Sequence, residues 1–231
     1  MYYYASYIFV LIAALISGIA SMNVKSTYKK YSRMRSASGM TGAQVAERML
    51  REAGISDVRV HRMDGVNDLN DFYSPTDKVL KLSAGVYDSD SVAAIGVAAH
   101  ECGHAIQDQE QYMPLKLRSI SVPVANIGSR LSWPILILGV ILGYYQLAQV
   151  GIACFLLVVF FQLVTLPVEF NASARALQIL ESDRILMDQE MDASRKVLRA
   201  AAMTYVAALF TTIMQLVRMI LISRGGDRRR R

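Results

Sequence analysis

Four long apolar segments with few charged residues limit the fold of this chain more than any other feature. They cover about residues 4–22, 131–147, 150–168 and 200–222. Each is close to the roughly 20 residues that a helix needs to cross a bilayer core. The first could instead be a cleaved signal peptide, but no Lys or Arg precedes it, as such a peptide requires. Any single segment could be a buried core helix, but together the four predict transmembrane helices.

The composition supports a membrane protein and argues against nucleic acid as a partner. Apolar residues make up 53% of the chain and charged residues 19%, below the roughly 25% of soluble domains. The net charge is +6, but most basic residues flank the apolar segments, where they orient a protein and contact anionic lipid. The bilayer is therefore the expected partner, and two cysteines give no basis for a disulfide framework.

Basic residues in the short connections predict the orientation. One cluster follows the first apolar segment and another lies between the third and fourth, and both fall on one side if the N-terminus is outside. The positive-inside rule makes that side cytoplasmic. The C-terminal Arg224 and Arg228–Arg231 would then lie outside, against the rule. The two clusters comprise Lys25, Lys29, Lys30, Arg33 and Arg35, and Arg175, Arg184, Arg195, Lys196 and Arg199.

The stretch 23–130 has a mixed composition that predicts a small water-exposed α+β domain. Thr41 and Gln44 have the spacing of a capping box, and the apolar positions after them predict an amphipathic helix that ends at Gly54. Residues 58–60 and 79–82 predict a pair of short strands with a turn at 74–75 between them. An Ala- and Val-rich helix is expected over 91–108.

The sequence His100-Glu101-Cys102-Gly103-His104 lies inside this last helix. Residues at i and i+4 project from one face, so both imidazoles can reach a single metal ion. Glu101 is offset around the helix and can hold a water. Zinc would lower the pKa of that water, and Glu101 would take its proton as general base and pass it to a leaving amine. A helix that carries two histidines by chance is the alternative, although the chain has only three histidines.

A catalytic zinc needs a third protein ligand and one open position. Glu169 is the best candidate because it follows the third apolar segment directly, where a carboxylate would be costly in lipid but useful as the helix emerges. It could also simply mark the end of a span. His61 lies far upstream of the motif. The weaker rivals are Glu181, Asp183 and Asp188.

Four further polar residues could support such a site. Ser173 lies one turn after Glu169 and Asn171 two residues after it, so either could hydrogen-bond a metal ligand. Arg175 could bind a substrate carboxylate or an oxyanion. Alternatively, it could face the phosphates of the lipid. Tyr73 could donate a hydrogen bond to an oxyanion.

Five stretches of the chain resemble the YugP-like membrane-bound neutral zinc metallopeptidases of bacteria. They are SGMTGA at 38–43, LS at 82–83, VY at 86–87, AAIGVAAHECGHAIQ at 93–107 and PVEFNAS at 167–173. The last is also similar to the glutamate segment of HtpX-type membrane proteases. The YugP-like family is similar to gluzincins, in which two motif histidines and a downstream glutamate hold zinc. The resemblance implies zinc ligation by His100, His104 and Glu169, with Glu101 catalytic.

The sequence thus predicts a mainly α membrane protein of about four transmembrane helices plus a small α+β zincin-like domain. The expected parts are an anchor helix (1–22), a cytoplasmic metallopeptidase domain (23–130), a transmembrane hairpin (131–168), a third-ligand helical segment (169–199), and a last transmembrane helix with a basic tail (200–231). We expect a bacterial, multi-pass, one-zinc endopeptidase in the cell membrane that acts on peptides or membrane proteins. The alternatives are a zinc-stabilised, non-catalytic scaffold or quality-control adaptor, and a hydrolase of non-peptide amides.

Overall fold

Helices dominate the computed structural model, which describes residues 2–63 and 70–227, so that the tail arginines Arg228–Arg231 lie outside the described part. The long helices are α1 (Tyr2–Tyr31), α5 (Met113–Leu142), α6 (Tyr145–Ser182) and α7 (Gln189–Asp227). The shorter elements are α2 (Gly42–Glu52), α3 (Ala84–Tyr87), α4 (Val92–Gln109), β1 (Arg59–Met63), β2 (Phe72–Ser74) and β3 (Val79–Ser83). This arrangement confirms the expected fold class, a mainly α protein with a small α+β part.

The chain divides into two compact units, each of which combines segments that are distant in sequence. Unit 1 consists of Met1–Ser21, Lys116–Leu166 and Thr204–Arg231. Unit 2 consists of Met22–Leu115 and Pro167–Met203. Helices α1, α5, α6 and α7 contribute residues to both units, because each continues past a boundary between them.

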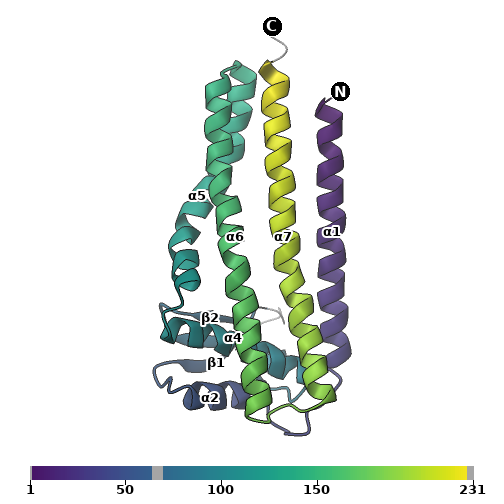
Figure 1. The fold of residues 1–231 in the computed structure, drawn as a ribbon, viewed down its shortest axis with the longest axis vertical. Coiled ribbons are helices and arrows are strands. Elements are labelled where there is room, and N and C mark those ends of the chain that lie inside the picture. Colours follow the sequence, from purple (N-terminus) through teal and green to yellow (C-terminus); the bar gives the residue numbers. More distant parts are fainter. Residues whose placement is uncertain (1, 64–69, 228–231) are drawn as a thin grey trace. The chain divides into compact units, whose positions relative to one another are not determined.

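Unit 1 is a helical bundle whose segments lie alongside one another in Figure 1. Among the described residues, four helices are long and apolar enough to cross a membrane, which agrees with the number expected from the sequence. Leu136, Ile152 and Met219 form part of a buried apolar cluster between α5, α6 and α7. Ser17 of α1 and Thr211 of α7 share a hydrogen bond of 2.8 Å, so α1 also packs into the bundle.

The turn of the hairpin lies earlier in the sequence than the apolar pattern predicted. The pattern placed the break near Gln149, but α5 ends at Leu142 and α6 begins at Tyr145. Gly143 adopts φ +68°, which favours glycine, and the N–H of Tyr144 donates to the carbonyl of Gly139. Gln149 lies inside α6 and donates to Ser223 of α7 at 3.3 Å. The apolar residues that follow the turn concealed it from a reading of hydropathy.

Helix α2 of unit 2 begins with the capping box that the sequence predicted. The Thr41 hydroxyl accepts from the Gln44 N–H at 3.3 Å, and the Gln44 side chain accepts from the Thr41 N–H at 2.9 Å. These two bonds satisfy N–H groups that a helix end leaves without partners. Helix α2 ends at Glu52, and Gly54 follows with φ +71°. Val45 and Met49 point from α2 into the core of the unit.

Among the described residues, the sheet of unit 2 has three strands in the order β1-β3-β2, where the sequence predicted two. Strand β3 pairs in parallel with β1 and antiparallel with β2, with Tyr73 opposite Leu80. β2 was missed because three residues are too few to show an alternating pattern. β3 is buried on both faces, and its Leu80 and Leu82 join the core with Ile95 of α4.

Candidate metal centre

Helix α4 carries both motif histidines and lies in the interior of unit 2. It begins after Ser91, whose hydroxyl accepts from the Ala94 N–H at 3.2 Å. This cap agrees with the start that the sequence predicted. Small side chains let neighbouring elements approach closely, and the fully buried alanines are Ala93, Ala94, Ala98 and Ala99. The position of the histidines is therefore fixed by packing on several sides of the helix.

Gly103 is a point of close approach between α4 and α6. A Cβ atom at this position would lie 2.5 Å from the carbonyl oxygen of Ala172. Only glycine fits so close to a backbone. Ala172 and Val168 are fully buried on the same helix, as is Glu169 between them. The glycine between the two histidines thus brings the buried face of α6 against the motif.

The three expected ligands come together in unit 2. His100, His104 and Glu169 each offer one ligand atom, and these atoms all lie within 4.8 Å of one another. Oε2 of Glu169 is 3.2 Å from Nε2 of His100 and 3.6 Å from Nε2 of His104. Only 2% of the Glu169 side chain is exposed. Of the carboxylates that the sequence offered as a third ligand, Glu169 is the one in the cluster.

These separations fit a tetrahedral ion. Zinc lies about 2.0–2.1 Å from nitrogen and oxygen ligands, so neighbouring ligands of a tetrahedral site are about 3.4 Å apart. The two distances from Glu169 to the imidazoles lie on either side of this value. Two nitrogens and one carboxylate oxygen are also a donor set that suits zinc. The residues present therefore fit the ion.

The second nitrogen of each imidazole is engaged by a side chain. Nδ1 of His104 donates to Oε1 of Gln107 at 3.0 Å, and the amide of Gln107 is fixed because its Nε2 donates to the Val168 carbonyl at 2.8 Å. Nδ1 of His100 lies 3.1 Å from the hydroxyl of Ser173. A neutral His104 with its proton on Nδ1 has a free lone pair on Nε2, the atom that faces Glu169. Such partners orient metal-binding histidines.

Glu101 is buried next to the cluster without belonging to it. Its Oε2 accepts from the backbone N–H of Tyr73 in β2 at 3.0 Å. Burial raises the pKa of Glu101, while the nearby His100 and His104 oppose that rise. A carboxylate whose pKa is raised toward neutrality suits proton transfer. The helix thus directs two imidazoles to one point and holds a carboxylate beside it.

Tyr73 contacts α4 at two places. Besides the bond from its N–H to Glu101, its hydroxyl donates to Asp108 at 2.8 Å. Burial and the hydrogen bond to Asp108 raise the pKa of Tyr73. Lys78 also donates to Asp108 at 2.6 Å, and this bond raises the pKa of Lys78. The hydroxyl that the sequence offered as an oxyanion donor is thus engaged at the far end of α4.

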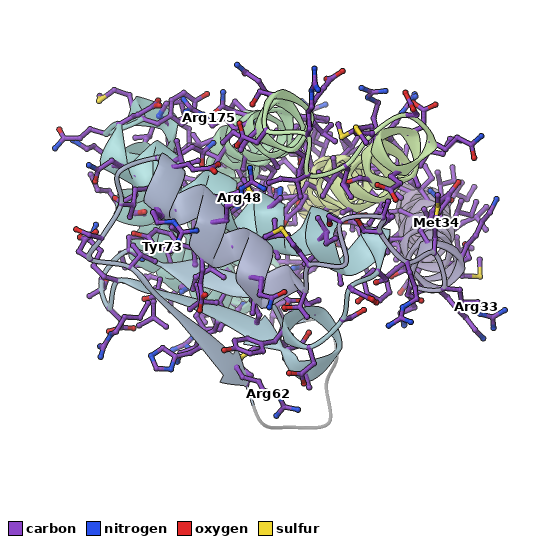
Figure 2. All side chains as sticks on the ribbon, turned by 90° about the horizontal axis from the view of Figure 1, so that it is seen from below. Arg33, Met34, Arg48, Arg62, Tyr73 and Arg175 are labelled. Carbon is purple, nitrogen blue, oxygen red and sulfur yellow. The ribbon has the colours of Figure 1, made fainter. Side chains whose placement is uncertain are left out.

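Asn171 and Arg175 are connected to the cluster through Gln107. Oδ1 of Asn171 accepts from Nε2 of Gln107 at 2.9 Å and from Nε of Arg175 at 2.7 Å. Arg175 also forms an ion pair of 2.6 Å with Glu110, and this contact lowers the pKa of Glu110. Figure 2 labels Arg175 on α6 and Tyr73 on the sheet. A chain of polar contacts therefore runs from His104 to Glu110.

The remaining candidates stay outside the cluster. Glu181, Asp183, Asp188 and His61 are not among the residues whose ligand atoms converge. Cys102 is buried on α4, where its Sγ donates to the carbonyl of Ala46 at 3.6 Å. Burial raises the pKa of this thiol, so Cys102 is a neutral packing residue.

Sequence reasoning missed two groups in this site. Gln107 lies three residues after His104, so both face the same side of α4, and this spacing was a usable signal. The Tyr73 N–H was missed together with its strand, since the predicted pair did not include β2. A backbone donor leaves no mark in the identity of a residue, so its role needed the structure.

Comparisons with known proteins identify the family to which the chain belongs. The model of a family described as "Putative neutral zinc metallopeptidase" matches residues 6–224. The chain is also 46% identical over 222 residues to "Putative membrane protease YugP" of Bacillus subtilis (strain 168), a match that covers 95% of this chain and 97% of that protein. No solved structure matches the chain at a significant level.

Proposed function

We propose that this chain is a membrane-embedded zinc-dependent endopeptidase. The proposal starts from two facts: the chain belongs to the neutral zinc metallopeptidase family, and it is a membrane protein. His100, His104 and Glu169 would hold one zinc ion, and Glu101 would act as general base. The observation that carries this proposal is the convergence of two Nε2 atoms and one carboxylate oxygen, with both Nδ1 atoms bonded elsewhere.

The chemistry divides between the ion and the residues around it. A zinc ion in this cluster would lower the pKa of a water toward 7 and polarise the carbonyl of the peptide bond. Glu101 would take a proton from that water as it attacks the carbonyl carbon and would deliver the proton to the leaving nitrogen. The Tyr73 N–H fixes the direction of the Glu101 carboxylate through the bond to Oε2. Burial of Glu101 limits competition from bulk water.

An extended peptide has a place to bind beside these residues. In the order β1-β3-β2, strand β2 has β3 on one side, and its other edge presents the Tyr73 N–H to Glu101. A peptide could lie along this edge as a further strand and donate to its carbonyl groups, since the Tyr73 N–H already donates to Glu101. The substrates would then be unfolded segments of membrane proteins, or peptides close to the bilayer surface.

The site would face the cytoplasm. Unit 2 contains both basic clusters of the short connections, and the positive-inside rule assigns such clusters to the cytoplasmic side. A cysteine placed at exposed Gln109 should react with a membrane-impermeant thiol reagent only after cells are opened. Equal labelling in intact cells would contradict this orientation.

The geometry favours catalysis over a purely structural role for the metal. A structural zinc is surrounded by four protein ligands, whereas catalytic sites keep one position open. In the part of the chain that the structure describes, three such residues converge. Glu101 is close by but bonds to Tyr73 instead of joining the cluster.

Substitution of Glu101 tests the proposal. Glu101→Gln in detergent-purified protein should retain one zinc per chain, because Glu101 is not a ligand, yet lose cleavage of fluorescein-labelled casein by at least about 100-fold, the range of general-base catalysis. His100→Ala should lose zinc and activity together. Glu47→Gln, a substitution at an exposed carboxylate of α2, is the control and should retain both. Full cleavage by the Glu101→Gln protein would refute the mechanism.

A further inference from the structure

Arg218 of α7 is a charged residue inside the last apolar segment, and it lies in unit 1. Its guanidinium carbon is 5.2 Å from the centre of the Tyr7 ring of α1 and 5.2 Å from the centre of the Trp133 ring of α5. Three helices of the bundle therefore meet at one cation. Contacts of this kind are favourable, but they leave a full positive charge in place.

Unit 1 offers this charge almost no anionic partner. Its segments contain a single carboxylate, that of Asp227, beyond the end of the apolar segment. Nε of Arg218 is buried and has no hydrogen-bond partner among the described residues. Oε1 of Gln215, less than one turn earlier on α7, is also buried and has no hydrogen-bond partner among the described residues. Buried polar groups normally have partners, and the Nε–H of Arg218 is a donor that an anionic acceptor would satisfy.

The depth of Arg218 indicates which anion can reach it. Arg218 lies six residues before exposed Arg224, which corresponds to about 9 Å along a helix. An arginine side chain can extend over much of that distance toward the headgroup level. The phosphates of the bilayer are at that level, and the basic residues at the end of the chain attract anionic lipids to the same leaflet.

We propose that Arg218, Tyr7 and Trp133 form a binding site for the phosphate of an anionic phospholipid, in the leaflet where the C-terminal end of α7 emerges. Two guanidinium N–H groups can donate to one phosphate in a fork, which a lysine cannot reproduce. The two rings restrict the guanidinium to one orientation, so the fork is already formed when lipid arrives. This inference is independent of the proposed peptidase activity.

Lipid retention in native mass spectrometry tests the site. The full chain is purified from nanodiscs that contain equal amounts of phosphatidylglycerol and phosphatidylcholine. The wild-type protein should retain phosphatidylglycerol preferentially, and Arg218→Gln should retain at least about tenfold less, the effect of one lost charge-assisted hydrogen bond. Arg224→Gln removes an equal charge at an exposed position and is the matched control. Equal retention by the Arg218→Gln and Arg224→Gln proteins would overturn the proposal.

Three further arms keep the test decisive. Trp133→Leu keeps the charge but removes one ring, so retention should fall even if Arg218→Gln fails to fold; unchanged retention would contradict the site. Inorganic phosphate at millimolar concentration should not displace the lipid, and displacement would identify a site for free phosphate instead. A dimer that depends on Arg218 and excludes lipid would assign the charge to a carboxylate of a second chain and would overturn the proposal.

Discussion

Replacement of Gln107 by leucine tests whether the contacts behind the histidines determine metal binding. Gln107 is fully buried and makes three hydrogen bonds, to Nδ1 of His104, to the Val168 carbonyl and to Oδ1 of Asn171. Leucine has a similar volume but can make none of them. Asn171 keeps its bond from Arg175, so the group left without an acceptor is the Nδ1–H of His104.

The size of the effect follows from these contacts. Loss of a partner that orients a metal-binding histidine typically reduces metal affinity by about 10- to 100-fold. In free energy this is about 1.4–2.7 kcal/mol at 25 °C. The buried N–H left without an acceptor costs about 1–3 kcal/mol in the metal-free protein as well. Gln107→Leu should therefore weaken zinc binding and lower the stability of the metal-free protein.

Zinc affinity is measured by competition with a chromophoric chelator in detergent, which requires no substrate. The control is Gln109→Leu, which removes a glutamine from an exposed position of the same helix. That control should bind zinc as the wild-type protein does. If the Gln107→Leu protein is folded and binds zinc with wild-type affinity, then the contacts from Gln107 do not orient His104 for metal binding.

Three further predictions follow from the same unit. Gly103→Ala would place a Cβ 2.5 Å from the Ala172 carbonyl oxygen, so the thermal unfolding temperature in detergent should fall, by an overpacking cost of about 1–3 kcal/mol; an unchanged temperature would contradict the close approach of α4 and α6. The lowered pKa of Glu110 means that its ion pair with Arg175 stabilises the protein above the ordinary carboxyl pKa and is lost as the pH falls through the lowered value. The stability difference between the wild-type protein and Glu110→Gln should therefore be small at pH 7 and vanish in acid, and an equal difference at both pH values would refute this. Removal of zinc by a chelator should lower the unfolding temperature of the wild-type protein but not of His100→Ala, because a ligand bound at 100 times its Kd stabilises by about 2.7 kcal/mol.

Local patterns predicted the elements around the motif well. The Thr41 capping box and the start of α4 each depend on side chains within four residues, and both were found where the sequence placed them. The histidine pair follows from one helical turn, so its geometry needs no tertiary information. The number of candidate spanning helices followed from segment length and hydropathy alone.

Features that depend on tertiary context were missed. Strand β2 exists because β3 provides partners for its three residues, and no pattern of its own marks it. The hairpin turn at Gly143 is set by a single backbone conformation within a continuous apolar stretch. The partners of Asn171 and Arg175 also depend on the approach of α6 to α4, so their contacts could be suggested from sequence but not assigned.

The position of Glu169 depends on tertiary packing, whereas the positions of the other two ligands depend on local helix geometry. His100 and His104 are placed by the geometry of one helix, but Glu169 is 65 residues beyond His104 and reaches them only when α6 packs against α4. That packing depends on the contact between Gly103 and Ala172, which lies within one turn of all three residues. A complete ligand set therefore cannot exist while α4 and α6 are apart. Metal binding and the docking of α6 should accordingly be thermodynamically linked, so each stabilises the other.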